Sequence, residues 1–106
     1  MEGLKQFDVC HNPDPASRAD IPFVAILQSD YVMGLGSVVV APLRRHGTHL
    51  PIAGLSLEVV LGGKPHLMNV HELATLQRRR LKPCGTSVSH LREKIVAAID
   101  SLFTGI

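Results

Sequence analysis

The stretch Ser87-Val-Ser-His-Leu-Arg-Glu-Lys-Ile-Val-Ala-Ala-Ile-Asp-Ser-Leu-Phe-Thr-Gly-Ile106 decides the fold. Its apolar residues recur in steps of three and four, at Val88, Leu91, Ile95, Ala98, Ile99 and Leu102. At about 100° per residue, this spacing predicts one long amphipathic helix that packs on a core. The hydroxyl residues that could cap its start are Thr86, Ser87 and Ser89. Gly105 should end it, because glycine adopts left-handed backbone angles without steric cost.

The opposite side of this predicted helix carries small residues where a solvated helix usually has long charged ones. These residues are Ala97, Ser101 and Thr104. Phe103 lies at the edge of the apolar stripe, and Ile106 ends the sequence. Small residues beside an aromatic side chain suit close docking by another protein. The alternative is that Phe103 and Ile106 pack back onto the core.

Composition limits the function classes. A chain of 106 residues is expected to form one domain, 1–106, with a core sufficient for folding. Its 45% hydrophobic content argues against disorder, and no apolar run approaches the ~20 residues that span a bilayer. The first residues lack a secretion signal, so we expect a cytoplasmic protein in which Cys10 and Cys84 stay reduced. A net charge of +2 does not by itself indicate nucleic-acid binding, but it permits an acidic partner.

The residues before the helix predict antiparallel strands. The expected strands are Leu4–Cys10, Ile21–Leu27, Ser37–Leu43, Leu55–Leu61, Lys64–Val70 and a short edge strand within Leu76–Leu81. Ile21–Leu27 is apolar throughout, which indicates burial on both faces. Pro42 should place its strand at an edge or end it, because proline donates no ladder hydrogen bond. Gly62-Gly63 predicts a hairpin turn.

The remaining segments are expected to connect these strands. They are the loops His11–Asp20, Arg44–Gly54 and Lys82–Thr86, and a single helical turn at His71–Thr75. The fold class is therefore α+β: a small antiparallel barrel or sandwich followed by one C-terminal helix.

No catalytic, metal or cofactor site is predicted. Six histidines are present, but none has further ligands at zinc spacing, so solvated or locally bonded histidines are favoured. The strongest charge run is Arg78-Arg79-Arg80 with Lys82. Such a run is either a solvated face or an electrostatic docking surface for an acidic polypeptide or a nucleic-acid backbone. The shortage of aromatic residues argues against base stacking.

Several stretches in order along the chain resemble the CcdB family, toxins of bacterial toxin–antitoxin pairs that poison DNA gyrase. They are Gln6-Phe7-Asp8-Val9, Phe23 to Asp30, Val38 to Leu43, Leu57 to Gly63, Leu67-Met68, Ser89-His90, Ala98-Ile99-Asp100 and Leu102-Phe103-Thr104-Gly105-Ile106. The loop from His11 to Asp20 and the segment from Arg44 to Ala53 match poorly.

The resemblance implies a homodimer built on an SH3-like barrel with a C-terminal helix. It also implies a non-enzymatic toxin that binds the gyrase A subunit, meets DNA only through gyrase or antitoxin complexes, and is neutralised by a cognate antitoxin. The gyrase-binding residues expected from it are Tyr31, Val32, Asp100, Phe103, Thr104, Gly105 and Ile106. The expected antitoxin-binding residues are Arg78, Arg79, Arg80 and Lys82.

Two positions depart from the family pattern. The best-known gyrase poison of this family has tryptophan at the position of Thr104 and asparagine at that of Asp100. A tryptophan buries on the order of 200 Å² at an interface, and threonine offers much less. One alternative is therefore a homologue that only binds antitoxin. A second alternative is a ribonuclease-type toxin, because related barrels in other toxin families cleave RNA. The latter would require a base and a phosphate-binding arginine, for instance His46 with Arg44 or Arg45.

Overall fold

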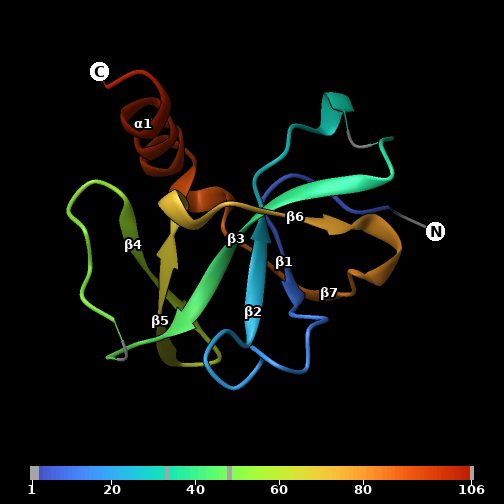
Figure 1. The fold of residues 1–106 in the computed structure, drawn as a ribbon, viewed down its shortest axis with the longest axis horizontal. Helices are drawn as coiled ribbons and strands as arrows, with labels where there is room; N and C mark the ends of the chain where they lie inside the picture. Colours follow the sequence, from blue (N-terminus) through green and yellow to red (C-terminus); the bar gives the residue numbers. More distant parts are fainter. Residues whose placement is uncertain (1–2, 33, 48, 106) are drawn as a thin grey trace.

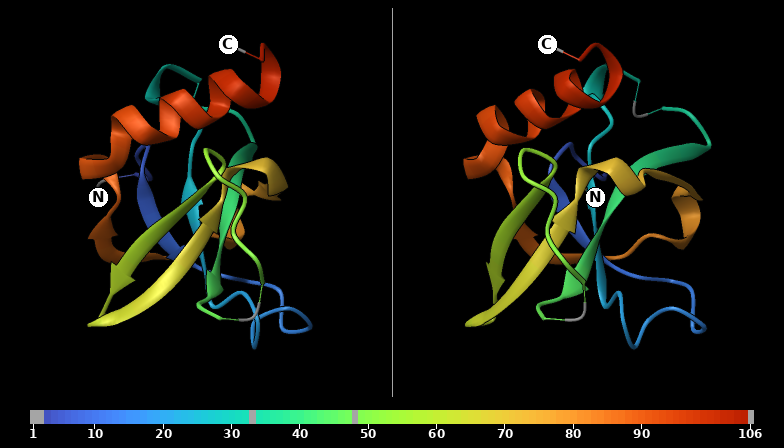
Figure 2. Two further views of the ribbon diagram at one scale, coloured as in Figure 1. Left: turned by 90° about the vertical axis from the view of Figure 1, so that its left-hand side faces the viewer. Right: turned by 60° about the vertical axis from the view of Figure 1, so that its left-hand side comes forward.

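A computed structural model describes residues 3–32, 34–47 and 49–105. These residues form a curled seven-stranded antiparallel sheet with one α-helix lying across one end (Figures 1 and 2). The strands are β1 Asp8–His11, β2 Phe23–Ile26, β3 Ser37–Arg45, β4 Ser56–Leu61, β5 Lys64–Asn69, β6 Ala74–Gln77 and β7 Pro83–Ser87. Four 3-10 turns, η1 Asp30–Val32, η2 Val70–Glu72, η3 Arg78–Arg80 and η4 Ser89–Leu91, connect them, and the helix is α1, Arg92–Phe103. The predicted α+β class with a C-terminal helix is confirmed.

The strand order is β4-β5-β3-β2-β1-β7, with β6 paired to the remaining edge of β3. Within the described residues β4 and β7 do not pair, so the sheet forms a half-barrel. The predicted hairpin joins β4 and β5 through Gly62 and Gly63. Both glycines have positive φ, 58° and 77°, which explains why this turn requires glycine.

Helix α1 buries the predicted stripe. Ile95 and Ala98 are fully buried, and Leu91 and Ile99 pack partly buried against the same core. The α-helix itself begins later than predicted, at Arg92, because Ser89–Leu91 forms the 3-10 turn η4. None of the three candidate caps is an N-cap residue, because Val88 precedes η4 and Leu91 precedes α1. The Ser87 Oγ nevertheless accepts the Ser89 N–H at 3.0 Å.

The end of α1 is as predicted. Gly105 has φ +74°, and its N–H and that of Thr104 both donate to the Asp100 carbonyl, at 3.2 and 2.8 Å. Because glycine adopts left-handed backbone angles without steric cost, the chain turns away from the helix axis at Gly105.

The sheet separates two apolar cores, and β2 contributes to both. Ala25 and Leu27 belong to the core beneath α1, whereas Val24 and Ile26 belong to a second core that includes Cys10, Val38, Val40 and Leu81. Since side chains alternate across a strand, β2 is buried on both faces, which confirms the prediction for Ile21–Leu27.

Pro42 does not end its strand, contrary to the prediction. It lies within β3, is buried, and pairs with Val24. The Leu27 N–H donates to the Val39 carbonyl. The backbone N–H and C=O groups of every second residue from Val39 onward therefore point toward β2, whereas the backbone groups of Pro42 point toward the opposite edge of β3. On that edge β3 pairs with β6 up to Val40 and with β5 from Leu43. The missing N–H therefore falls where the partner changes.

Several other predicted boundaries were wrong. The first strand begins at Asp8 rather than Leu4, because residues 6–7 form a turn in which Phe7 has φ +72°. The expected loop Lys82–Thr86 contains β7, which pairs with β1. The expected helical turn His71–Thr75 is split between η2 and β6. Of the expected edge strand Leu76–Leu81, Leu76 and Gln77 end β6, whereas Arg78–Arg80 form the 3-10 turn η3. Pairing with a distant strand, which has no local signature, explains β6 and β7.

Both cysteines are free thiols in this structure. Burial, then the neighbouring Cys84 and Asp8, raise the pKa of Cys10 to about 12. Burial also raises the pKa of Cys84. Both groups are therefore held as neutral thiols near pH 7. In the described part of the chain, no helix is long and apolar enough to cross a bilayer.

Candidate protein-interaction surfaces

The end of α1 presents an aromatic side chain to solvent. Phe103 is 68% exposed, so the alternative in which it packs onto the core is wrong. Asp100, Thr104 and Gly105 beside it are also exposed. The Thr104 hydroxyl donates to the Asp100 carbonyl at 2.6 Å, so its polar atom is already bonded within the helix end. Ile106, the remaining predicted contact of this group, lies outside the described residues.

The other predicted gyrase contacts, Tyr31 and Val32, lie on η1. Tyr31 is 95% exposed and Val32 41%. The turn is held from both sides: Asp30 accepts the Gln6 N–H at 2.7 Å, and Gln28 donates to the Val32 carbonyl at 3.0 Å. Figure 1 shows η1 and the C-terminal end of α1 at the same end of the molecule but at opposite corners. Within one chain they therefore form two separate exposed patches.

The predicted antitoxin-binding residues surround η3, and all four are exposed. Arg79 bonds the Gln77 side chain at 3.3 and 3.4 Å, whereas Arg80 donates to the Pro13 carbonyl at 3.1 Å. The run therefore does not form one uniform face, because its side chains reach different neighbours.

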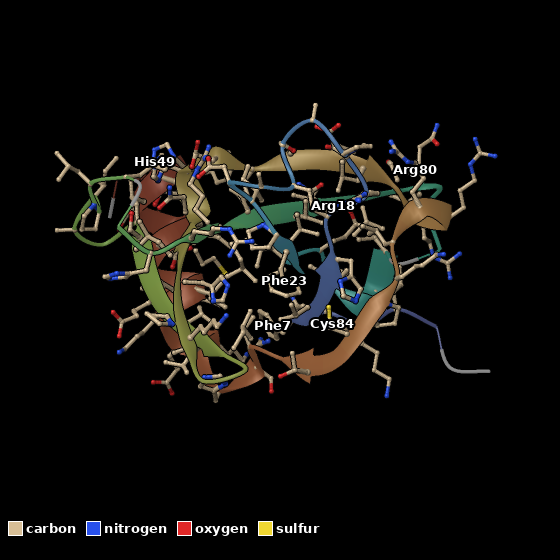
Figure 3. The ribbon with its side chains drawn as sticks, turned by 90° about the horizontal axis from the view of Figure 1, so that it is seen from below. Phe7, Arg18, Phe23, His49, Arg80 and Cys84 are labelled. Atoms are coloured by element: carbon tan, nitrogen blue, oxygen red, sulfur yellow. The ribbon has the colours of Figure 1, made fainter. Side chains whose placement is uncertain are left out.

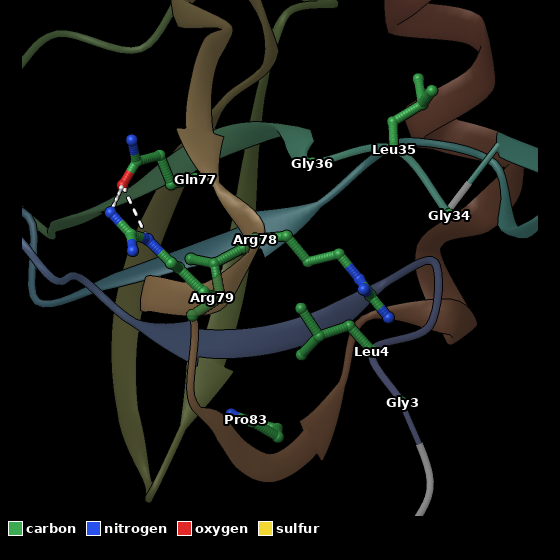
Figure 4. A pocket seen from close by; sticks show the side chains of 10 residues that line it. Gly3, Leu4, Gly34, Leu35, Gly36, Gln77, Arg78, Arg79 and Pro83 are labelled. Carbon is green, nitrogen blue, oxygen red and sulfur yellow. Dashed lines mark hydrogen bonds between the residues drawn. The ribbon is translucent and has the colours of Figure 1, made fainter.

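Two hollows flank η3. The first measures about 530 Å³, and Figure 4 shows Arg78, Arg79, Leu4, Leu35 and Pro83 around it. The second measures about 380 Å³ and is lined by His11, Asn12, Pro13, Arg18, Arg80 and Lys82. Arg18 is not among the residues predicted from the sequence, since its loop has no periodicity that would place it. Only the return of that loop beside η3 brings it near Arg80 (Figure 3).

Arg44, which was considered for a possible ribonuclease site, forms salt bridges with two carboxylates. Its guanidinium forms two 2.8 Å bonds with Glu72 and also pairs with Asp20. The Arg44 hydrogen bonds, aided by Asn69, hold the pKa of Glu72 down at about 2, and Glu72 in turn raises the pKa of Arg44. The side chain of Arg44 is only 14% exposed. It fastens the loop before β2 and the turn η2 to β3.

The other residues of that possible site also have partners. The Arg45 Nε donates to the Ala19 carbonyl at 2.6 Å, and His46 lies 3.5 Å from Glu58. Arg45 and His46 therefore interact with different segments of the chain, the loop before β2 and the strand β4.

Two further histidines have local contacts. His66 is buried, with its Nδ1 3.0 Å from the Lys64 carbonyl and its ring edge-on to Phe23. His49 lies 3.2 Å from Asp20. No group of three or more His, Cys, Asp or Glu residues that could hold a metal ion occurs among the described residues.

The comparison with known families agrees with this structure. The family model described as CcdB protein matches residues 6–105. No curated protein matches the chain. The family match covers the whole sheet and α1, including the exposed helix end and the basic turn η3. The chain therefore belongs to the CcdB family of toxins.

Proposed function

We propose that this protein is the toxin of a toxin–antitoxin pair that binds the A subunit of DNA gyrase through the end of α1. It inhibits the topoisomerase without performing chemistry, and a cognate antitoxin neutralises it. The observation that carries the proposal is the exposure of Phe103 at the end of a chain matched to the CcdB family over residues 6–105. Aromatic side chains, phenylalanine among them, are enriched in protein interfaces.

A dimer is part of the proposal. The outer face of α1 carries Ala97 and Ser101, both exposed, and Val96 is 41% exposed beside them. Two copies related by a twofold axis would present two helix ends to one symmetric target. Sedimentation should give a dimer at micromolar concentration, and a monomer there would contradict this arrangement.

A supercoiling assay with purified gyrase tests the main claim. Phe103→Ala and deletion of Gly105 and Ile106 should abolish inhibition, because each removes contact surface from the helix end. Lys94→Gln, a change on an exposed residue in the first turns of the same helix, is the matched control and should inhibit like the parent. Inhibition that survives both changes at the helix end would overturn the proposed binding mode.

Thr104→Trp tests whether the departure from the family pattern limits inhibition. The substitution should strengthen inhibition by about tenfold, since ~1.4 kcal/mol of additional burial gives each factor of ten. Folding should hardly change, because Thr104 is exposed and its hydroxyl bonds only the Asp100 carbonyl. If neither parent nor Thr104→Trp inhibits gyrase while both are folded, gyrase is not the target and the homologue that only binds antitoxin is favoured.

The ribonuclease alternative has a direct test. Arg44 and Arg45 are held by Glu72 and by the Ala19 carbonyl, which supports a structural role for both. Incubation with the protein should leave RNA intact. Cleavage of RNA by the parent that is absent in His46→Ala would favour a ribonuclease over the proposed function.

The basic residues of η3 and Lys82 are proposed to attract the acidic antitoxin. Opposite charges accelerate association at low ionic strength, and salt screens the effect. An association rate that is the same at low and high salt would remove these residues from the antitoxin site.

A further inference from the structure

The turn η3 separates two hollows of different chemical character. We propose that they accept successive parts of one acidic peptide: an aliphatic side chain in the first hollow and a carboxylate in the second. Under the proposed function, on which this inference rests, the peptide belongs to the antitoxin. The proposal adds the apolar hollow and Arg18 to the basic run, and it assigns the residues of that run to separate roles.

The first hollow is built to hold an apolar group beneath a charged rim. Its walls include Leu4, Leu81 and Pro83, and Leu35 stands 55% exposed at its edge. The guanidinium of Arg78 reaches across toward Gly3, where its Nη2 would lie 3.6 Å from an added Cβ (Figure 4). At about 530 Å³ the hollow lies within the range of about 300–1,000 Å³ that is usual for ligand pockets.

The second hollow has two arginines held in place by one backbone group. Arg18 Nη2 and Arg80 Nη2 donate to the Pro13 carbonyl at 3.3 and 3.1 Å, and Arg18 Nε donates to the Asn12 carbonyl at 3.0 Å. Lys82 lines the same hollow. Guanidinium groups held in this way lose little freedom when they bind a carboxylate.

The carboxylate of Asp14 interacts electrostatically with both arginines but does not line the hollow. The oxygens of Asp14 accept the Ser17 hydroxyl at 2.9 Å and the Ala16 N–H at 3.1 Å. In the described part of the chain, Asp14 forms no ion pair with Arg18 or Arg80 within 4.0 Å. The excess of positive charge in the hollow therefore favours an anionic group supplied by a partner.

A peptide fits the pair of hollows better than a nucleic acid does. A phosphate backbone offers no aliphatic group for the walls formed by Leu4, Leu35 and Pro83. Recognition of bases would require stacking surfaces, and among the described residues the His11 imidazole is the single aromatic ring that lines either hollow. An acidic segment with interspersed aliphatic residues satisfies both hollows together.

The test begins with peptides selected from a random display library for binding to the parent protein. Selected peptides should contain both acidic and aliphatic residues. Binding of one such peptide is then measured for the parent, for Arg18→Gln combined with Arg80→Gln, for Leu35→Ser, and for Lys64→Gln. Lys64→Gln, in the β4–β5 hairpin, removes one positive charge outside both hollows and is the control for an effect of net charge alone.

Double-mutant cycles identify which peptide group enters which hollow. The arginine variant should weaken binding by about tenfold or more, as expected for charge-assisted bonds, and a peptide whose acidic residue is neutralised should lose nothing further. Leu35→Ser should weaken binding several-fold, and its effect should disappear with a peptide whose aliphatic residue is replaced by serine. Lys64→Gln should change affinity less than twofold.

Four results would each overturn the inference. The first two are a selection that does not enrich acidic peptides, and equal losses of peptide affinity in the arginine and Lys64 variants. The other two are a peptide affinity that Leu35→Ser does not change, and a single-stranded oligonucleotide that binds more tightly than the peptide and requires Arg18 and Arg80. Gyrase assays on the same variants separate this inference from the proposed function. Unchanged inhibition by the arginine variant with lost peptide binding supports both. Peptide binding at the hollows by a parent that does not inhibit gyrase would overturn the gyrase target alone.

Discussion

Arg44 and the arginines of η3 have the same side chain but opposite environments. The side chain of Arg44 is 14% exposed and bonds two carboxylates. Arg78, Arg79 and Arg80 are exposed, and none of them bonds a carboxylate among the described residues. Arg79 bonds the side-chain amide of Gln77, and Arg80 bonds the Pro13 carbonyl. In the sequence, the consecutive run is conspicuous and Arg44 is not. The comparison teaches that a charge is structural or available according to the partners that distant segments bring to it.

Of the substitutions considered, replacement of Arg44 should lower the free energy of unfolding the most. A small loss of stability would contradict the contrast between Arg44 and the arginines of η3. Arg44→Gln should lower the free energy of unfolding by about 3 kcal/mol, because it leaves Glu72 and Asp20 without their shared cation. Urea denaturation measures the change, with Arg79→Gln as the exposed counterpart. Equal losses for the two variants would show that burial does not distinguish them.

Acid titration sharpens the comparison at the partner of Arg44. The pKa of Glu72 is about 2 in the folded protein and 4.5 as the ordinary value, so its ionised form is stabilised by folding. This stabilisation is complete above about pH 4.5 and is lost as the pH falls toward 2. With allowance for its 33% exposed side chain, it amounts to about 2 kcal/mol. The stability gap between parent and Glu72→Gln should close over that pH range, and a gap independent of pH would contradict the ion pair.

The smallest effect on stability is expected at η3. Replacement of Arg78, Arg79 and Arg80 by glutamine should change the free energy of unfolding by no more than about 0.5 kcal/mol, because these side chains are exposed. The same variant should show a weaker salt dependence of association with an acidic peptide, because Arg18 and Lys82 remain beside the second hollow. A large loss of stability would mean that the run supports the fold rather than a partner.

Local patterns predicted the elements that depend on neighbouring residues. The stripe that includes Ile95 and Ala98 is buried as expected, and Gly62-Gly63 forms the expected hairpin turn. The exposed Phe103 was one of two open alternatives, since it lies at the edge of the stripe and periodicity does not decide its side. The strand β7 was missed, because Pro83–Ser87 contains proline and glycine and becomes a strand only by pairing with β1.

The sequence by itself determined the α+β class, the amphipathic helix and the family resemblance, because these follow from the spacing and order of residues along the chain. Only the tertiary structure decided that Pro42 could remain inside β3, that Arg44 is held by Glu72 and Asp20, and that Arg18 joins Arg80 beside η3. The physical reason is that hydrogen bonds and charges act over a few ångströms in space. Segments distant in the sequence supply those partners, and no local period records where the loops that carry them will meet.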